Sequence, residues 1–280
     1  MKRLIVKAPA KINLGLNIIS KREDGFHNLE TIFYPVEGLF DVLTFEEAPR
    51  YSLITKNLEI PDVKENLVTK AKEMIEEFTG KELNVKITLK KNIPVGGGLG
   101  GGSSDAAKTL LGLNEFFELN IPKRELYKMA LELGSDVPFF LLSRPAFAES
   151  RGEIMLTLNF KINFPVLLVN PGIHISTKEA FGYIEPKEEH IDYLKVSSLS
   201  DMEMAKLNSL LKNDFEDFVF SKYPEIKQIK DKLTESGAFF AMMTGTGSTV
   251  YGIFESLAEA ETARKKFKDK YFTFLEFETE

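Results

Sequence analysis

The sequence predicts a fold built from both strands and helices, and three observations predict it. The first sixty residues carry the short apolar or alternating runs that are typical of strands. A glycine-rich stretch at 94–102 follows an alternating strand pattern at 83–89 and precedes a helical pattern. Beyond residue 165, strand and helix patterns share the rest of the chain. The length of 280 residues allows two modest domains or one large one.

The individual elements follow from periodicity and from capping residues. The strands expected in the first half are Leu4–Lys7, Asn13–Ile19, Leu29–Tyr34, Asp41–Glu46, Tyr51–Thr55, Leu83–Leu89 and a run within 146–158. Helices are expected at 66–79, from Ser103 or Ser104 as caps onward, at 122–133, 201–211, 224–236 and 257–268. The later strands are Val166–Val169, Gly237–Met243, Thr249–Phe254 and Tyr271–Phe277. The segment 161–165 is the candidate boundary, which divides the chain into domains 1–160 and 161–280.

Composition excludes several classes of function. The chain has no cysteine, so disulfides, thiol nucleophiles and iron–sulfur clusters are excluded, and its three scattered histidines make a histidine-based metal site unexpected. A net charge of −6 argues against a nucleic-acid-binding surface. No apolar run approaches the length of a membrane span, and the first residues lack a signal-peptide cleavage region. We therefore expect a cytoplasmic protein without membrane or nucleic-acid partners.

The glycine-rich stretch predicts a phosphate-binding loop. Glycine allows a loop to wrap closely around a ligand, and the N–H groups at the start of the following helix attract anions. The P-loop pattern is excluded because Gly102 is followed by Ser103 rather than by lysine. A dinucleotide fingerprint on Gly96, Gly98 and Gly101 is a weak match in so glycine-rich a loop. A flexible linker is the remaining alternative, although linkers rarely connect a clear strand to a clear helix.

Lys11 and Asn13 form a second candidate site, within Pro9-Ala10-Lys11-Ile12-Asn13-Leu14. They lie two residues apart, so on a strand both side chains point to the same face. A lysine and an amide together suit an anionic or hydroxyl-bearing ligand. By itself the pair is more typical of the solvated face of an ordinary strand.

Three further segments combine turn residues with chemically active side chains. Asp24-Gly25 indicates a turn, and Phe26-His27 follows it with a flat ring and a hydrogen-bonding ring. Asp136 stands among Gly, Ser and Pro before an apolar run, where an aspartate is more often a turn or cap residue than a base. The segment Thr244–Ser248 is either a tight hairpin or a second backbone cradle facing the first loop across a cleft. A phosphate loop, a strand lysine and a carboxylate are the parts that phosphoryl transfer requires.

Taken together, these segments resemble the GHMP kinases, and more closely the family of 4-diphosphocytidyl-2-C-methyl-D-erythritol kinases within them. The glycine loop by itself resembles only the superfamily, whereas Pro9–Leu14 and Asp24-Gly25-Phe26-His27 are more specific. The other segments that follow the family's order are Pro94–Ala107, Gly134–Phe139, Asn170-Pro171-Gly172 with Thr177 and Phe181, Asn213–Glu216, Tyr223–Ile226 and Thr244–Ser248. The resemblance extends from one end of the chain to the other.

The resemblance implies a two-domain α+β fold, with an N-terminal ATP-binding domain and a smaller C-terminal domain of sheet and helices. It implies that Asp136 is the general base, that Lys11 is its charged neighbour and that Mg²⁺ accompanies ATP. The expected ATP-binding residues are Asn66, Pro94, Gly96, Gly97, Gly98, Leu99, Gly100, Gly101, Gly102, Ser103 and Ser104, with Ser104 also the best candidate for a metal ligand. The residues expected to bind a cytidine diphosphate substrate are Asn13, Phe26, His27, Thr177, Phe181 and Thr246, with Phe26 and Phe181 on either side of the cytosine ring.

The sequence departs from the family pattern at two of these places. Phe26 stands where the family usually has tyrosine, which keeps the stacking face and loses a hydroxyl. Ser150 replaces a common glycine. Two alternatives remain open: another GHMP kinase acting on a small alcohol such as homoserine or mevalonate, and a nucleotide-binding sensor without catalysis. The Phe26-His27 pair and Phe181 speak against the first, and the intact Lys11 and Asp136 against the second.

Overall fold

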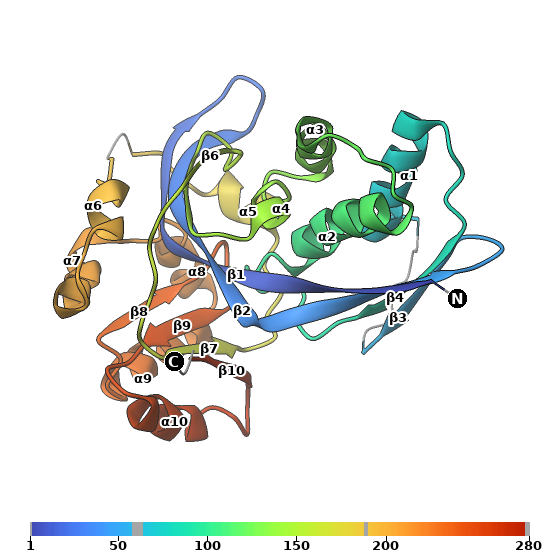
Figure 1. The fold of residues 1–280 in the computed structure, drawn as a ribbon. Helices are drawn as coiled ribbons and strands as arrows, with labels where there is room; N and C mark the ends of the chain where they lie inside the picture. Colours follow the sequence, from blue (N-terminus) through green and yellow to red (C-terminus); the bar gives the residue numbers. More distant parts are fainter. Residues whose placement is uncertain (1, 58–63, 188–189, 278–280) are drawn as a thin grey trace. The chain divides into compact units, whose positions relative to one another are not determined.

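The computed structural model describes residues 2–57, 64–187 and 190–277, and in these residues the chain forms two compact units (Figure 1). Unit 1 comprises residues 1–10, 36–93 and 100–143, and unit 2 comprises residues 11–35, 94–99 and 144–280. These units do not follow a single cut in the chain, so the division into 1–160 and 161–280 stays a prediction. Helices and strands are both abundant, as the sequence predicts.

Two long strands, β1 (Arg3–Lys21) and β2 (His27–Glu47), pair with each other and contribute residues to both units. The sequence predicts each of them as two short strands. The breaks expected at 8–12 and 35–40 do not occur because backbone pairing continues through both segments. The motif Pro9–Leu14 therefore lies in the middle of a continuous strand.

Unit 1 contains parts of β1 and β2 together with two further strands, and helices cover them. In it β4 (Val85–Lys90) pairs in parallel with β3 (Ser52–Lys56) and antiparallel with the second half of β2. The helices are α1 (Leu67–Thr79), α2 (Gly101–Phe116), α3 (Lys123–Leu133) and α4 (Phe139–Leu142). Figure 1 shows α1, α2 and α3 gathered on one side of these strands. Close packing of α2 on the sheet is evident at Gly112, where a Cβ atom would come within 2.6 Å of the Phe45 ring.

The ends of α1 follow the sequence prediction. Asn66 is the N-cap, and its Oδ1 accepts the Val68 N–H at 2.8 Å. Gly80 ends the helix in the left-handed conformation, with φ of 66°. Both residues are typical of those positions, so the local sequence is sufficient to set this helix.

Unit 2 contains a short hairpin and a separate antiparallel sheet. The first half of β2 pairs with β5 (Ala146–Glu149), which pairs with β6 (Ile154–Thr157). The second sheet has the order β10 (Phe272–Glu276), β7 (Val166–Asn170), β9 (Val250–Ile253) and β8 (Phe240–Met243). The helices are α5 (Thr177–Gly182), α6 (Tyr193–Ser197), α7 (Leu207–Leu210), α8 (Glu216–Lys222), α9 (Pro224–Glu235) and α10 (Leu257–Lys265), with a 3₁₀ segment at Asp201–Lys206.

The core of unit 2 joins this sheet to α8, α9, α10 and part of β1, through residues such as Ile18, Leu167, Phe215, Leu233 and Phe254. Four helices are absent from the sequence prediction, namely α4, α5, α6 and α8, because each has seven residues or fewer and shows little periodicity. The helix expected at 201–211 is instead a 3₁₀ segment followed by α7. No helix in the described residues is long and apolar enough to cross a membrane.

Candidate active site

Lys11 and Asn13 lie side by side on β1 and are almost completely buried. Lys11 Nζ donates to Asn13 Oδ1 at 2.6 Å, and the two residues are 3% and 2% exposed. Asn13 Nδ2 donates to Thr31 Oγ1 at 3.0 Å, and the Lys11 ammonium lies 5.3 Å from the centre of the Phe33 ring. The same-face prediction is confirmed, and the alternative of a solvated strand face is wrong. A buried ammonium group requires polar partners, which this strand pair supplies.

The glycine loop contacts the loop between β8 and β9 directly, within unit 2. Thr249 N–H donates to the Gly97 carbonyl at 3.2 Å, and Thr244 Oγ1 lies 3.4 Å from the Gly98 carbonyl. Gly98 has a φ of 76°, and a Cβ atom there would lie 2.2 Å from the Thr244 carbonyl oxygen. Glycine is therefore required at this position both for its conformation and for the close approach of the two backbones.

The segment Thr244–Ser248 connects a hairpin, since β8 and β9 pair antiparallel with Met243 opposite Val250. The hairpin alternative is thus confirmed. The alternative of a second backbone cradle stays a prediction, although the two loops are in direct contact at Gly97 and Gly98. Thr244 also joins the hairpin to the lysine pair, since its Oγ1 accepts the Asn13 backbone N–H at 2.9 Å.

The second part of the glycine loop belongs to unit 1 and leads into α2. The helix begins at Gly101, with Gly100 as N-cap at φ of 70° and no capping side chain. The prediction that Ser103 or Ser104 caps the helix is wrong. The left-handed Gly100 turns the chain into the helix three residues earlier, so that both serines lie in its first turn. The N–H groups of this turn receive no side-chain cap, which suits an anion-binding helix start.

Ser104 is fully buried, and its Oγ has no hydrogen-bond partner among the described residues. A buried hydroxyl without a partner is uncommon in folded proteins and requires an explanation. No group of three or more His, Asp or Glu side chains that could hold a metal ion occurs in the described part of the chain. An oxygen ligand such as Ser104 Oγ fits Mg²⁺, which commonly takes few protein ligands beside nucleotide phosphates and water.

A buried ionic cluster, missing from the sequence prediction, connects the two ends of the glycine loop within unit 1. Lys91, which follows β4, donates to Asp105 Oδ2 on α2 at 2.7 Å and also to Asp41 on β2. Asp41 Oδ1 accepts the backbone N–H groups of Asn92 and Ile93, at 2.5 and 2.9 Å. The three charged side chains are each less than a tenth exposed. The cluster therefore fixes both the strand before the loop and the helix after it.

Burial and ion pairing act in opposite directions on the pKa values of Asp105 and Lys91. Burial raises the pKa of Asp105 to about 7, against the lowering effect of Lys91 and with a further increase from Asp41. Burial also opposes the charge on Lys91, but contact with Asp105 and Asp41 outweighs it and raises the pKa of this ammonium group. The sequence signal that could have revealed the cluster is the position of Lys91 and Asp105 on either side of the glycine loop.

The structure places Asp136 in the turn between α3 and α4, half-buried in unit 1. Asn66 lies in the same unit as the N-cap of α1, which gives it a structural role besides the expected one in ATP binding. Lys11 belongs to unit 2. The pairing of Asp136 with Lys11 stays a prediction.

The residues expected at the cytosine ring are partly brought together in unit 2. His27 is buried and stacks on Phe181 with centroids 5.1 Å apart, and Phe181 meets the edge of Phe215 at 4.9 Å. Phe26 is 49% exposed. The neighbours of Phe181 are therefore His27 and Phe215, and its arrangement opposite Phe26 around a base stays a prediction.

Two further observations concern residues that are expected to bind the cytidine substrate. Thr177, the first residue of α5, and Thr246 approach each other, with 3.5 Å between their Oγ1 atoms. Burial, together with the nearby charge of Lys21, lowers the pKa of His27 below its ordinary value of 6.5. The neutral imidazole is therefore the form present at pH 7, and it can donate or accept one hydrogen bond at a base edge.

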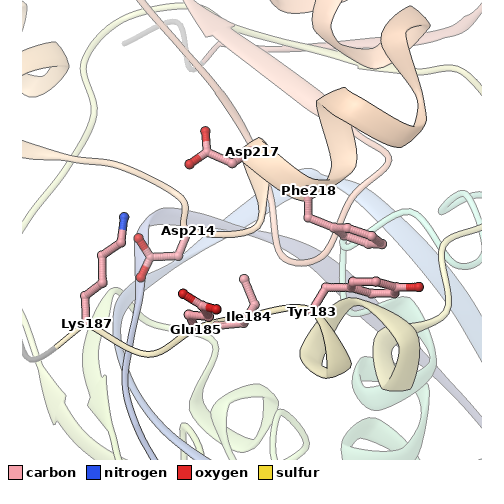
Figure 2. Close-up of a pocket in the computed structure, with 7 residues that line it drawn as sticks. All are labelled: Tyr183, Ile184, Glu185, Lys187, Asp214, Asp217 and Phe218. Carbon is pink, nitrogen blue, oxygen red and sulfur yellow. The ribbon is translucent and has the colours of Figure 1, made fainter.

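A separate cavity of about 200 Å³ lies in unit 2 beside α8 (Figure 2). Figure 2 shows the rings of Tyr183 and Phe218 face to face at one side of it, 4.5 Å apart. Its lining also includes Ile184, Glu185, Lys187, Asp214 and Asp217. With three carboxylates and a volume below the usual range for ligand pockets, it is unsuited to a nucleotide.

Comparison with known proteins agrees with this set of features. Residues 66–144 match the model of the GHMP kinases N terminal domain, and residues 198–273 match that of the GHMP kinases C terminal. A 4-diphosphocytidyl-2-C-methyl-D-erythritol kinase of Chlorobium phaeobacteroides is 41% identical over 97% of this chain and 96% of its own. The corresponding kinase of Citrifermentans bemidjiense is 37% identical, with 94% of each chain covered.

Solved structures show the same relationship. A crystal structure of 4-(cytidine 5′-diphospho)-2C-methyl-D-erythritol kinase is 31% identical, with a TM-score of 0.83 over 97% of this chain and 98% of the other. The homoserine kinase of Cytophaga hutchinsonii shares the fold, with a TM-score of 0.73, 18% identity, and coverage of 98% and 94%. The chain therefore belongs to the GHMP kinases, and within them to the family of the 4-diphosphocytidyl-2-C-methyl-D-erythritol kinases.

Proposed function

We propose that this chain transfers the γ-phosphoryl group of ATP to the 2-hydroxyl of 4-diphosphocytidyl-2-C-methyl-D-erythritol, a step of the non-mevalonate (MEP) route to isoprenoid precursors. The observation that carries the proposal is the buried Lys11–Asn13 pair, which β1 holds against two glycine loops in a chain of this family. A buried cation beside closely packed loop backbones suits phosphate groups. We place the reaction in the cytoplasm, where ATP is supplied.

Each residue contributes positioning or charge rather than covalent chemistry, as phosphoryl transfer requires. Asp136 accepts the proton of the substrate hydroxyl as its oxygen attacks the γ-phosphorus, and ADP leaves with the bridging oxygen. Lys11 offsets negative charge on the transferred group. The N–H groups of the glycine loop and of the first turn of α2 hold the phosphates of ATP.

Mg²⁺ would be held by Ser104 Oγ together with phosphate oxygens of ATP. When bound, it neutralises phosphate charge. The buried and partnerless hydroxyl of Ser104 is the support for this assignment.

The proposed cytidine site lies around the His27–Phe181 stack. Stacking tolerates every base, so discrimination must come from polar groups at the base edge. His27 is the candidate in this stack for such a group, since its ring is neutral and ordered against Phe181. Thr177, Thr246 and Asn13 would contact the rest of the substrate.

A coupled assay that detects ADP tests the proposed function directly. The cytidine diphosphate substrate should be turned over, whereas homoserine and mevalonate should not. ADP formation with homoserine or mevalonate as the preferred acceptor would favour another GHMP kinase, and ATP binding without turnover of any acceptor would favour a sensor.

The uridine analogue of the substrate tests the base-reading step. It replaces the amino group of cytosine by a carbonyl, so a buried partner of that amine is left mismatched, at a cost of about tenfold or more in kcat/KM. His27→Ala should raise the KM of the cytidine substrate and leave the KM of ATP unchanged. Equal use of both nucleotides by the wild-type enzyme is incompatible with a base-reading pocket.

A further inference from the structure

The turn that carries Phe26 is organised by Arg22. The Arg22 backbone N–H donates to the Phe26 carbonyl at 2.8 Å, and its guanidinium group contacts Asp24 through Nε and Nη2 at 3.1 Å. Asp24 Oδ1 in turn accepts the Phe26 N–H at 3.1 Å. The remaining arm of the guanidinium, Nη1, donates to Asn28 Oδ1 at 3.0 Å. The backbone at Phe26 is thus held by its own turn.

The same arm of Arg22 also reaches the turn between β5 and β6. Arg22 Nη1 donates to Ser150 Oγ at 3.0 Å, and Ser150 Oγ donates to Glu153 Oε1 at 3.1 Å. Leu29 N–H donates to the Ser150 carbonyl at 2.7 Å. Ser150 adopts a φ of 63°, which is unfavourable for a residue with a side chain. The two hydrogen bonds of its hydroxyl offset that cost, and glycine could not make them.

Arg151, the next residue, lies against the ring of Phe26. Its guanidinium carbon is 4.7 Å from the ring centre, and Glu153 lies beside it, with 3.7 Å from Arg151 Nε to Glu153 Oε1. Glu153 Oε2 also accepts the Arg151 backbone N–H at 2.7 Å. The cation therefore covers one face of a phenylalanine ring that is half exposed.

An aromatic ring has two faces, and a stacked base needs only one. A half-exposed ring on a turn loses rotational freedom when it binds a base, and that loss weakens binding. A guanidinium group fixed against the other face removes part of this freedom before binding occurs. Cation–π contacts at such exposed sites correspond to a factor of about two to five in an equilibrium constant.

We propose that Arg151, held by Glu153 and by the Ser150–Arg22 contact, is a positioning residue for the nucleobase, because it orders the Phe26 ring as the platform on which cytosine stacks. The proposal rests on the proposed function, which assigns Phe26 to the base. Under this proposal, the turn between β5 and β6 contributes to the affinity for cytidine nucleotides. The chemical class of ligand is a pyrimidine nucleoside diphosphate.

Arg151→Met tests the role of the cation, because methionine keeps an apolar side chain and lacks the planar, charged guanidinium group. Calorimetry with cytidine 5′-diphosphate should show a Kd about two- to fivefold higher. The KM of the cytidine substrate should rise by the same factor, with kcat, the KM of ATP and the melting temperature unchanged. Arg151→Lys should lie between the wild type and Arg151→Met. Lys7→Met removes a comparable contact with Phe40, 4.3 Å away in unit 1, and should leave the Kd unchanged.

A double-mutant cycle decides whether Arg151 acts through Phe26. Phe26→Leu should raise the Kd by about fivefold to a hundredfold, as loss of a base stack does. Adding Arg151→Met to that variant should change nothing further. Additive effects, or an unchanged Kd in Arg151→Met, overturn this inference and leave the stacking role of Phe26 intact. An unchanged Kd in Phe26→Leu overturns the stacking role and this inference together.

Ser150→Ala isolates the contribution of the hydroxyl. Alanine keeps a side chain at the left-handed position and cannot join Arg22 to Glu153. The Kd of cytidine 5′-diphosphate should rise in the same direction as in Arg151→Met. A lower melting temperature with an unchanged Kd would reduce Ser150 to a structural role, and would exclude the Arg22 contact from the proposal.

Discussion

Lys11 holds a positive charge in a position that is almost inaccessible to water. Its ammonium group contacts Asn13 Oδ1 and the ring of Phe33, and Asn13 Oδ1 also lies 3.2 Å from Thr244 Oγ1. A charge held by a strand and by a hairpin loop does not need to reorganise when a phosphoryl group is transferred nearby. Fixed charges of this kind stabilise transition states more than ground states.

Lys11→Met should therefore lower kcat by about 10²–10³ and change the KM of ATP much less. Methionine fills most of the same space, and Asn13 keeps its contact with Thr244, so the fold should persist. Steady-state kinetics at varied ATP concentration provide the measurement. If only the KM of ATP changes, Lys11 is a ground-state phosphate ligand instead.

Asp136→Asn is the matching test of the proposed general base. The amide has nearly the same shape and cannot accept the proton, so kcat should fall by about 10²–10⁴ while the melting temperature stays the same. Asp231→Asn, an exposed aspartate on α9 that pairs with Lys227, is the control and should retain full activity. A near-normal kcat in Asp136→Asn removes this residue from the mechanism.

At the scale of elements, the start of α2 combines uncapped N–H groups with a buried hydroxyl. The helix begins at Gly101, and Ser104 and Thr109 are both fully buried within it. Thr109 Oγ1 donates to the Asp105 carbonyl at 2.7 Å, whereas Ser104 Oγ has no partner in the described residues. Thr109 Oγ1 therefore has a structural partner, whereas Ser104 Oγ can take the proposed role of metal ligand.

Ser104→Ala should leave the melting temperature unchanged or slightly raised, because it removes a buried polar group that makes no hydrogen bond. Turnover should fall, and the Mg²⁺ concentration needed for half-maximal activity should rise. Thr109→Val is the matched control, with a stability loss of about 1 kcal/mol and unchanged activity. A normal Mg²⁺ dependence in Ser104→Ala would exclude Ser104 as a metal ligand.

At the scale of the whole molecule, the glycine loop belongs to both units. Pro94–Leu99 lies in unit 2 with Lys11, whereas Gly100–Ser104 lies in unit 1 with the Lys91–Asp41–Asp105 cluster. The cluster anchors the loop on the unit 1 side through an ion pair that is almost completely buried. Its protonation therefore affects the stability of the chain as a whole.

The stability contributed by Asp105 should depend on pH between about 4 and 7. Burial raises its pKa from 3.8 to about 7, so the folded chain binds this proton more tightly than the unfolded chain does. The contribution is fully present below pH 3.8 and is lost as the pH rises through about 7. The Asp105→Asn variant has no proton to lose at this position. Its melting temperature should therefore increase relative to that of the wild type as the pH rises from 4 to 7. A constant difference across this range contradicts the prediction.

Much of the local structure, including the same-face placement of the candidate site residues Lys11 and Asn13, could be predicted from the sequence. Asn66 and Gly80 set the ends of α1, and a period of two placed Lys11 and Asn13 on one face of β1. Dihedral preference and side-chain alternation are local properties, so short windows of sequence contain them. The position of the glycine loop between a strand and a helix follows for the same reason.

Which distant segments meet could be learned from the folded chain and not from local patterns. No local pattern relates Gly97 to Thr249 or Lys91 to Asp41, yet the fold brings each pair into contact. The burial of Lys11 likewise depends on distant segments that cover it. The helix start at Gly101 was likewise decided by a left-handed glycine rather than by the better capping serines. Such outcomes depend on the free energy of packing the whole chain, in which burial and close backbone contacts outweigh the preferences of single residues.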